Sequence, residues 1–268
     1  GKAAGMPNDF RNEDYGLKKL KVATRNGVVF ATFADKIEPL EEYLTPEILA
    51  DMDVVFDGRK LKLLGYYRNE LPGNWKMYFE NLKDPYHATL LHSYLVTFGL
   101  MVAGSKSAMI ADRSGRHGTM ASAKPDNVES VLDDSTKKEM RLNFVREFKS
   151  PWSVTMQTIW PNLIVQRELN TLGIRHIVPN GPHSMIMNWV MFGYEGDTDE
   201  MTRHRLKQGN LMGPSGFLGL EDNEAIKFVQ EGVRRSPTDK SVLLLGGTEA
   251  GSADSLISEA AIRGMYKH

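Results

Sequence analysis

Four strand-like runs joined by very short connections constrain the fold of this chain more than any other feature. They cover residues 153–160, 163–169, 173–178 and 184–194. Each run is rich in β-branched, aromatic or long apolar residues, and turn residues such as Asn180-Gly181-Pro182 separate them. Parallel neighbours need a crossover of about a dozen residues or more. The spacing therefore predicts an antiparallel meander.

Helical spacing follows the strands. Apolar residues recur at intervals of three or four over residues 198–208, over residues 223–235, and from about Asp254 onward. Strands grouped first and helices grouped after them are typical of an α+β fold. We therefore expect an antiparallel β-sheet with helices packed on one face.

Two hairpins and a strand are predicted upstream of the meander. Asn26-Gly27 suits a type I′ turn between residues 20–24 and 28–33, and Ser114-Gly115 lies between two further short strands. Residues 60–67 have strand character, whereas residues 35–51 and 124–150 read as connecting segments with short helices.

Composition excludes several classes of protein and of site. The 268 residues include no cysteine, so the chain itself cannot hold a disulfide or a cysteine-bound cluster. The 33 basic and 34 acidic residues argue against a nucleic acid or anionic membrane held by bulk charge. The most apolar stretch, residues 88–103, is interrupted by His92 and Ser93, and no cleavable leader is visible. We expect a cytoplasmic location, and we expect metal ligands to be histidines and carboxylates.

The densest group of polar side chains lies in the segment ENLKDPYHATLLH. Asn81, Asp84, His87 and His92 would cover about 140° of an ideal helix. The two histidines are five residues apart and diverge by about 140°, so a shared metal requires the helix to end or kink between them. Two structural alternatives stand beside this: Asp84 before Pro85 suits a helix N-terminus, and a histidine on an apolar helix is often a hydrogen-bonded core residue.

A third metal ligand would have to come from elsewhere in the chain. The glycine-rich segment GPSGFLGLED ends in Glu221 and Asp222 at the predicted start of a helix. Two histidines and one carboxylate suit non-haem iron with open coordination positions, or zinc. The alternative is that Glu221 or Asp222 only caps the helix.

The two segments together resemble a known family. NWKMYFENLKDPYHATLLH resembles the N-W-K-x-x-x-E-N-x-x-D-x-Y-H-x-x-x-x-H signature of Rieske-type ring-hydroxylating oxygenase large (α) subunits, and GPSGFLGLED resembles the family's loop with the iron carboxylate. DPYHATLLHSYLVTFGL is most similar to the branch acting on aromatic acids such as salicylate, anthranilate and terephthalate. The resemblance implies a helix-grip catalytic domain, similar to START and Bet v 1 proteins, over residues 37–268. Residues 1–36 would be the hairpin segment that follows a Rieske domain missing from this sequence.

The resemblance also implies the site and its chemistry. His87, His92 and Asp222 would hold mononuclear Fe(II), Asp84 would lie on the electron path to His87, and Asn81 would be a polar neighbour that does not ligate. The reaction would be mono- or dioxygenation of an aromatic ring with O2, in aromatic hydrocarbon catabolism. The expected substrate is an aromatic carboxylate.

The partners follow from the same resemblance. Electrons would come from a Rieske [2Fe-2S] cluster in a neighbouring subunit, expected in the full-length protein but not in these residues, and from a ferredoxin and an NADH-dependent reductase. The assembly would be a homotrimer, or an α3β3 complex with a small β subunit. Neither a nucleic acid nor a membrane is expected as a partner.

Substrate contacts are less constrained. Apolar side chains that could line a pocket are Tyr94, Phe98, Met101, Met156 and Val165. Core packing is the alternative for all of them. A buried arginine could bind a substrate carboxylate through its planar fork. Arg167 and Arg175 lie on predicted strands and are the candidates, unless each faces solvent on the polar side of the sheet.

Two other functions remain open at this level. An antiparallel sheet gripping a long helix also suits a non-catalytic carrier of lipids or other small molecules, with an apolar cavity and no metal. A zinc hydrolase would use the same three ligands in a tetrahedral site.

Overall fold

The computed structural model describes residues 5–98, 100, 105–124, 133–139 and 143–268. The chain forms two compact units, Gly1–Tyr43 and Leu44–His268. The first unit contains the 3-10 helix η2 (Asn12–Tyr15) and the hairpin of β1 (Lys21–Arg25) and β2 (Val28–Thr32). Asn26 and Gly27 both have positive φ, 50° and 86°, as a type I′ turn requires. The first predicted hairpin is therefore confirmed.

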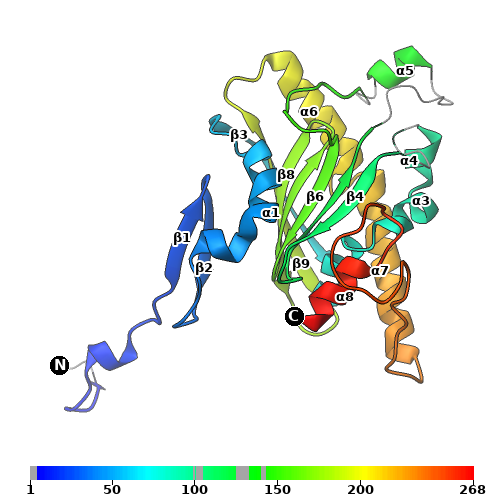
Figure 1. Ribbon diagram of the computed structural model, residues 1–268. Coiled ribbons are helices and arrows are strands. Elements are labelled where there is room, and N and C mark those ends of the chain that lie inside the picture. The colour runs from blue at the N-terminus through cyan, green and yellow to red at the C-terminus, as the bar shows by residue number, and fades with distance from the viewer. Residues whose placement is uncertain (1–4, 99, 101–104, 125–132, 140–142) are drawn as a thin grey trace. The chain divides into compact units, whose positions relative to one another are not determined.

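The second unit is built on a seven-stranded antiparallel sheet with the order β3-β9-β8-β7-β6-β5-β4 (Figure 1). Its strands are β3 (Leu61–Leu71), β4 (Ser107–Ala111), β5 (Gly118–Ser122), β6 (Val154–Ile159), β7 (Leu163–Glu168), β8 (Thr171–Pro179) and β9 (Met185–Tyr194). The meander prediction is confirmed, since β6 to β9 pair in sequence order. Strand β3 joins the sheet beside β9 and extends beyond the predicted run.

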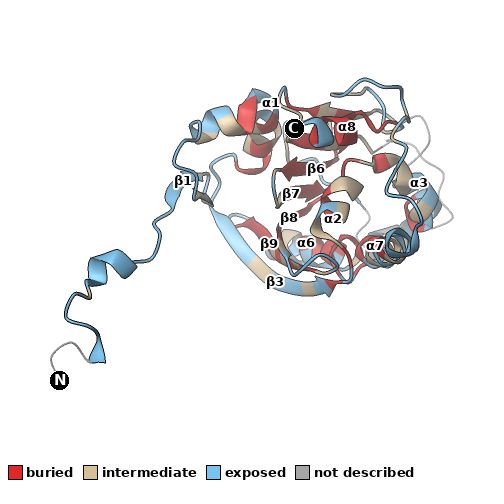
Figure 2. Ribbon diagram, turned by 90° about the horizontal axis from the view of Figure 1, so that it is seen from below, coloured by how far each residue is buried: buried red, intermediate tan, exposed pale blue. Residues whose placement is uncertain are grey.

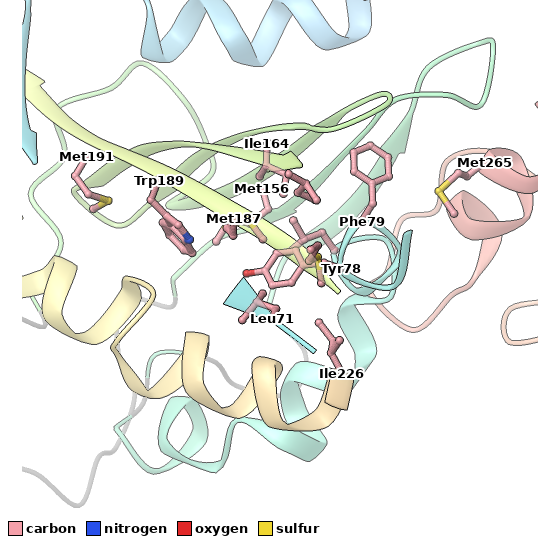
Figure 3. Close-up of a cluster of buried hydrophobic side chains, with 13 residues drawn as sticks. Leu71, Tyr78, Phe79, Met156, Ile164, Met187, Trp189, Met191, Ile226 and Met265 are labelled. Carbon is pink, nitrogen blue, oxygen red and sulfur yellow. The ribbon is translucent and has the colours of Figure 1, made fainter. Parts of the chain in front are cut away.

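Helices from distant parts of the sequence cover one face of this sheet (Figure 2). They include α2 (Trp75–Asn81), α6 (Asp199–Met212), α7 (Phe217–Arg235) and α8 (Ala260–Lys267). Figure 3 shows Tyr78 of α2 lying between Ile226 of α7 and the strand that carries Met187, and Phe79 of α2 belongs to the same buried cluster. The predicted α+β class is therefore confirmed.

One helix lies against the opposite face of the sheet. From Leu44 onward, α1 (Leu40–Val55) buries Ile48, Met52 and Val55 completely. The backbone carbonyl of Ile48 accepts a hydrogen bond of 2.8 Å from Nε2 of Gln157. Successive strand residues point to opposite faces, so Gln157 faces α1 while Met156 faces the other helices.

The segment that carries the predicted histidines is broken into four short pieces. These are α2, the 3-10 helix η3 (Pro85–His87), α3 (Ala88–Leu91) and α4 (Ser93–Thr97). Pro85 has no backbone N–H to continue α2, and His92 leaves the helical region with φ −89° and ψ 69°. The continuous helical spacing of the sequence is thus interrupted at the two places that decide where the imidazoles point.

Helix α6 begins at Asp199, as predicted, but two later helices begin at residues different from those expected. Helix α5 (Asp134–Glu139) is the described short helix of the 124–150 segment. Helix α7 begins at Phe217 rather than near residue 223, and α8 begins at Ala260 rather than near Asp254. No helix within the described residues has the length and apolar character needed to cross a membrane.

Candidate metal centre

Four separate elements bring the predicted polar residues together. Asn81 ends α2, His87 ends η3, and His92 lies between α3 and α4. Asp222 lies in the second turn of α7, distant in sequence but adjacent in space. The site is therefore formed only when α7 packs against the broken helical segment.

The glycine-rich loop before α7 sets the position of Asp222. Gly216 is the N-cap of α7, and a Cβ there would lie 2.0 Å from the carbonyl oxygen of Leu211. A Cβ on Gly219 would lie 2.8 Å from the carbonyl oxygen of Gly213. Only glycine permits this close return of the chain, and it allows α7 to start one turn before Glu221 and Asp222. Neither carboxylate caps the helix, so the capping alternative is wrong.

The two imidazoles and the distant carboxylate converge on one point. Oδ1 of Asp222 lies 3.2 Å from Nε2 of His92 and 3.4 Å from Nε2 of His87. One ligand atom from each of the three residues lies within 4.8 Å of the others. Metal–ligand bonds of about 2.1 Å at right angles place neighbouring ligand atoms about 3 Å apart. The observed separations therefore fit a single transition-metal ion.

Hydrogen bonds at the far side of each ring fix its orientation. Nδ1 of His87 is hydrogen-bonded to the backbone carbonyl of Asp84, and Nδ1 of His92 lies 2.7 Å from Oε2 of Glu221. An acceptor at Nδ1 places the proton there and leaves the lone pair of Nε2 for a metal. Both rings are therefore oriented with Nε2 toward Asp222, as a metal site formed by the three residues requires.

Burial makes the three groups depend on one another. Asp222 and His92 are each 1 % exposed. Burial acts to raise the pKa of Asp222, but hydrogen bonds from His87 and His92 outweigh it and hold this pKa well below its usual range. Burial acts to lower the pKa of His92, and Asp222 together with Glu221 raises it. The site thus keeps its carboxylate ionised and ready to bind a cation.

Asn81 lies beside the converging atoms. Its Nδ2 is 3.3 Å from Oδ1 of Asp222 and 3.4 Å from Nε2 of His87, and its Oδ1 is buried with no hydrogen-bond partner among the described residues. A buried amide oxygen without a donor is unusual. It leaves an acceptor at the edge of the site for a metal-bound or substrate group that donates.

Asp84 lies next to the site without joining the three ligands. Its side chain makes no capping bond to η3, so the purely structural interpretation of Asp84-Pro85 is incomplete. Burial, with the neighbouring Glu259 and Glu80, raises the pKa of Asp84 to about 7. Its Oδ1 is buried and has no partner in the part of the chain that the structure describes.

A largely apolar cavity opens beside the three converging groups. His87, His92, Asp222 and Asn81 are among the residues that line it. Apolar side chains from the sheet and the helices form most of its wall, among them Leu95, Leu100, Met120, Met156, Met212 and Leu218. Glu168 of β7 also lines the cavity, and it was not among the predicted site residues. The alternation of side chains along a strand predicts which residues of β7 share a face with Glu168, but it does not show which face points into the cavity.

The structure separates the predicted substrate contacts. Met156 lines the cavity, as expected, but Phe98 packs against Tyr94, Leu95 and Leu218, outside the set of lining residues. Val165 alternates with the residues of β7 that face the cavity and points to the opposite face. Met101 lies outside the described residues.

Both candidate arginines are fully buried, so the solvent-facing alternative is wrong. Arg167 lies on the α1 face, where its Nη2 contacts Asp51 at 3.2 Å. Arg175 faces the site side but not the cavity: it donates to Oε1 of Gln166 from Nε at 3.0 Å and from Nη2 at 2.8 Å. Neither guanidinium lines the described cavity wall. A direct clamp on a substrate carboxylate therefore finds no support at either position.

Comparisons with known proteins agree on the identity of this domain. The family model for the ring hydroxylating alpha subunit (catalytic domain) matches residues 59–268. The chain is 46 % identical to the large oxygenase component of salicylate 5-hydroxylase from Ralstonia sp., covering 98 % of this chain and 65 % of that protein. It is 37 % identical to the anthranilate 1,2-dioxygenase large subunit from Burkholderia cepacia, covering 98 % and 64 %.

A solved structure supports the fold. Naphthalene 1,2-dioxygenase from Rhodococcus sp., bound to indole, matches with a TM-score of 0.71 at 22 % identity, covering 92 % of this chain and 64 % of that one. At this identity the likeness concerns the fold alone. The chain spans about 65 % of the length of the curated relatives it matches.

Proposed function

The chain belongs to the family of ring-hydroxylating α-subunit catalytic domains, as its motifs predicted, and from this premise we propose that it hydroxylates an aromatic ring with O2 at a mononuclear Fe(II) centre. The observation that carries the proposal is the convergence of Nε2 of His87, Nε2 of His92 and Oδ1 of Asp222 beside a largely apolar cavity that the three residues line. A bound ferrous ion supplies the redox chemistry that lets O2 react with the ring.

The protein's own residues have three tasks in this proposal. His87, His92 and Asp222 would hold the ion, and the cavity that they line would receive the substrate. The backbone carbonyl of Asp84 and the carboxylate of Glu221 orient the rings by hydrogen-bonding to Nδ1 of His87 and Nδ1 of His92. The apolar wall of the cavity excludes water from the bound ring.

The substrate, the partners and the location are proposed from the relatives. The named substrates of the two curated relatives are salicylate and anthranilate, and we propose an aromatic acid for this chain. Electrons come from a Rieske [2Fe-2S] cluster outside these residues, in a neighbouring subunit, supplied by a ferredoxin and an NADH-dependent reductase. Asp84 lies on the route to His87. The assembly is a homotrimer or an α3β3 complex in the cytoplasm.

The experiment loads the chain anaerobically with Fe(II) and adds an aromatic acid with hydrogen peroxide, which provides the oxidising equivalents of O2 plus two electrons. Mass spectrometry then looks for a product that has gained one oxygen atom, with water released, or two hydroxyl groups. We expect one iron per chain and product formation from wild type. A chain that takes up zinc but not iron, or that binds iron and forms no oxygenated product, contradicts the proposal.

The matched variants are Asp222→Ala and Glu224→Ala. Glu224 lies on the same helix as Asp222 but is exposed and pairs with Lys227 at 2.8 Å. Asp222→Ala should lose iron and product together, because it removes one of three ligands, while Glu224→Ala should keep both.

A further inference from the structure

Glu168 is the described acidic residue on the cavity wall that the metal site does not use. It ends β7 and is only 4 % exposed. The described residues that line the cavity include no lysine or arginine to neutralise it. A carboxyl group in such a place costs free energy unless it is hydrogen-bonded, so its presence needs a reason.

A chain of hydrogen bonds holds this carboxyl group from behind. Oε2 of Glu168 accepts from Nε2 of Gln166 at 2.8 Å, and Oε1 of Gln166 accepts from two nitrogens of Arg175. Arg175 is in turn fixed by Oη of Tyr78 at 2.9 Å and by the ring of Trp189, 4.0 Å from its guanidinium carbon. Arg175 is thus connected to Glu168 through the side-chain amide of Gln166, and its guanidinium does not line the cavity.

The other carboxyl oxygen remains open to a donor. Among the described residues, Gln166 is the hydrogen-bond partner of this side chain, and it uses Oε2 alone. Burial raises the pKa of Glu168 to about 7, against the opposing effects of Arg175, Gln166 and His92, while Asp222 adds to the rise. Because Glu168 lines the cavity, a group bound there can supply one more donor to this carboxyl group.

We infer that Oε1 of Glu168 accepts a hydrogen bond from a hydroxyl or amino substituent on the aromatic substrate and so selects rings that carry such a donor. This inference rests on the proposed function, since it takes the cavity beside the metal centre as the substrate site. Gln166 and Arg175 are positioning residues that fix the carboxylate. A ring without a donor leaves the buried oxygen unpaired, which penalises its binding.

The test compares binding rather than turnover. The Fe(II)-loaded chain is titrated anaerobically by calorimetry with the three hydroxybenzoates and with the three methylbenzoates, whose methyl group has nearly the size of a hydroxyl but donates nothing. We expect at least one hydroxybenzoate to bind about tenfold or more tightly than its methyl counterpart. Equal affinities for all three pairs in wild type overturn the inference.

Two variants separate recognition from a structural role. Glu168→Leu should abolish the preference for hydroxyl over methyl while keeping methylbenzoate affinity, because apolar neighbours can pack a leucine. Glu168→Gln should keep part of the preference through its amide oxygen. The preference surviving intact in Glu168→Leu overturns the inference, as does a greater loss for methylbenzoates than for hydroxybenzoates.

A control variant and a second measurement keep this test separate from the proposed function. Glu195→Leu removes an exposed glutamate, 3.8 Å from Lys60, and should leave all affinities unchanged. Iron content is measured on every sample. If wild type binds iron and the ring acids but shows no preference for hydroxyl over methyl, only the role of Glu168 is refuted. Failure to bind iron would refute the proposed function.

Discussion

Replacing Glu221 with alanine should weaken Fe(II) binding although Glu221 is not one of the three ligands. Its Oε2 lies 2.7 Å from Nδ1 of His92, and its side chain is 29 % exposed. Loss of such a partner frees the ring to rotate and to change tautomer, at a typical cost of 10- to 100-fold in metal affinity. Because solvent already reaches Glu221, we expect a loss of about tenfold, or about 1.4 kcal/mol.

The assay is an anaerobic competition titration of Fe(II) against a chelating dye, which gives the dissociation constant of each variant. Glu221→Gln keeps an acceptor for Nδ1 and should lose less than Glu221→Ala. Glu224→Ala, three residues along the same helix and exposed, should bind like wild type. An unchanged dissociation constant for Glu221→Ala would show that this carboxylate does not orient His92 for metal binding.

Two further predictions concern stability, each measured by urea unfolding. Ile48→Ala should lower the free energy of unfolding by about 2–4 kcal/mol, because this α1 side chain is fully buried. The control Val229→Ala, at an exposed position, should change it by less than about 0.5 kcal/mol. Equal effects of the two substitutions would show that α1 does not pack as described. Burial lowers the pKa of Lys83 from 10.5 to about 7. Between these two pH values the unfolded chain binds more protons at Lys83 than the folded chain does. The free energy of unfolding of wild type should therefore rise relative to that of Lys83→Met between pH 7 and pH 10, by up to about 1.4 kcal/mol per pH unit. Parallel plots of this free energy against pH for the two proteins would contradict the prediction.

The fold was predictable from the sequence where local chemistry decides it. The meander follows from turn residues such as Asn180-Gly181 and from gaps too short for a crossover. The hairpin at Asn26-Gly27 follows from the positive φ that both residues tolerate. The position of α1 was not predictable, because Pro39 and Pro46 suggest a connecting segment and nothing local shows that Ile48 packs on the far face of the sheet.

The candidate site was predictable in its residue types but not in its geometry. Five-residue spacing argues against His87 and His92 sharing a metal on one ideal helix, and the break at His92 removes that objection. From the sequence, Glu221 and Asp222 could cap a helix or supply a metal ligand. The start of α7 at Phe217 places neither residue at the cap and gives the two carboxylates different partners. Asp222 points to both imidazoles, while Glu221 holds the far side of His92.

The cavity wall was the least predictable part of the molecule. Arg167 and Arg175 look equivalent in sequence, yet the pleat and the register of β7 and β8 send them to opposite faces of the sheet. Glu168 gave no signal of its own, because its role depends on the residues that surround it in three dimensions. Local patterns cannot carry that information.

The most direct test of the metal centre is a crystal structure of the chain after anaerobic Fe(II) loading, with anomalous data collected at the iron absorption edge. We expect one anomalous peak about 2.0–2.2 Å from Nε2 of His87, Nε2 of His92 and a carboxylate oxygen of Asp222. A peak bound elsewhere, or a fully loaded crystal in which Asp222 does not contact the ion, would contradict it.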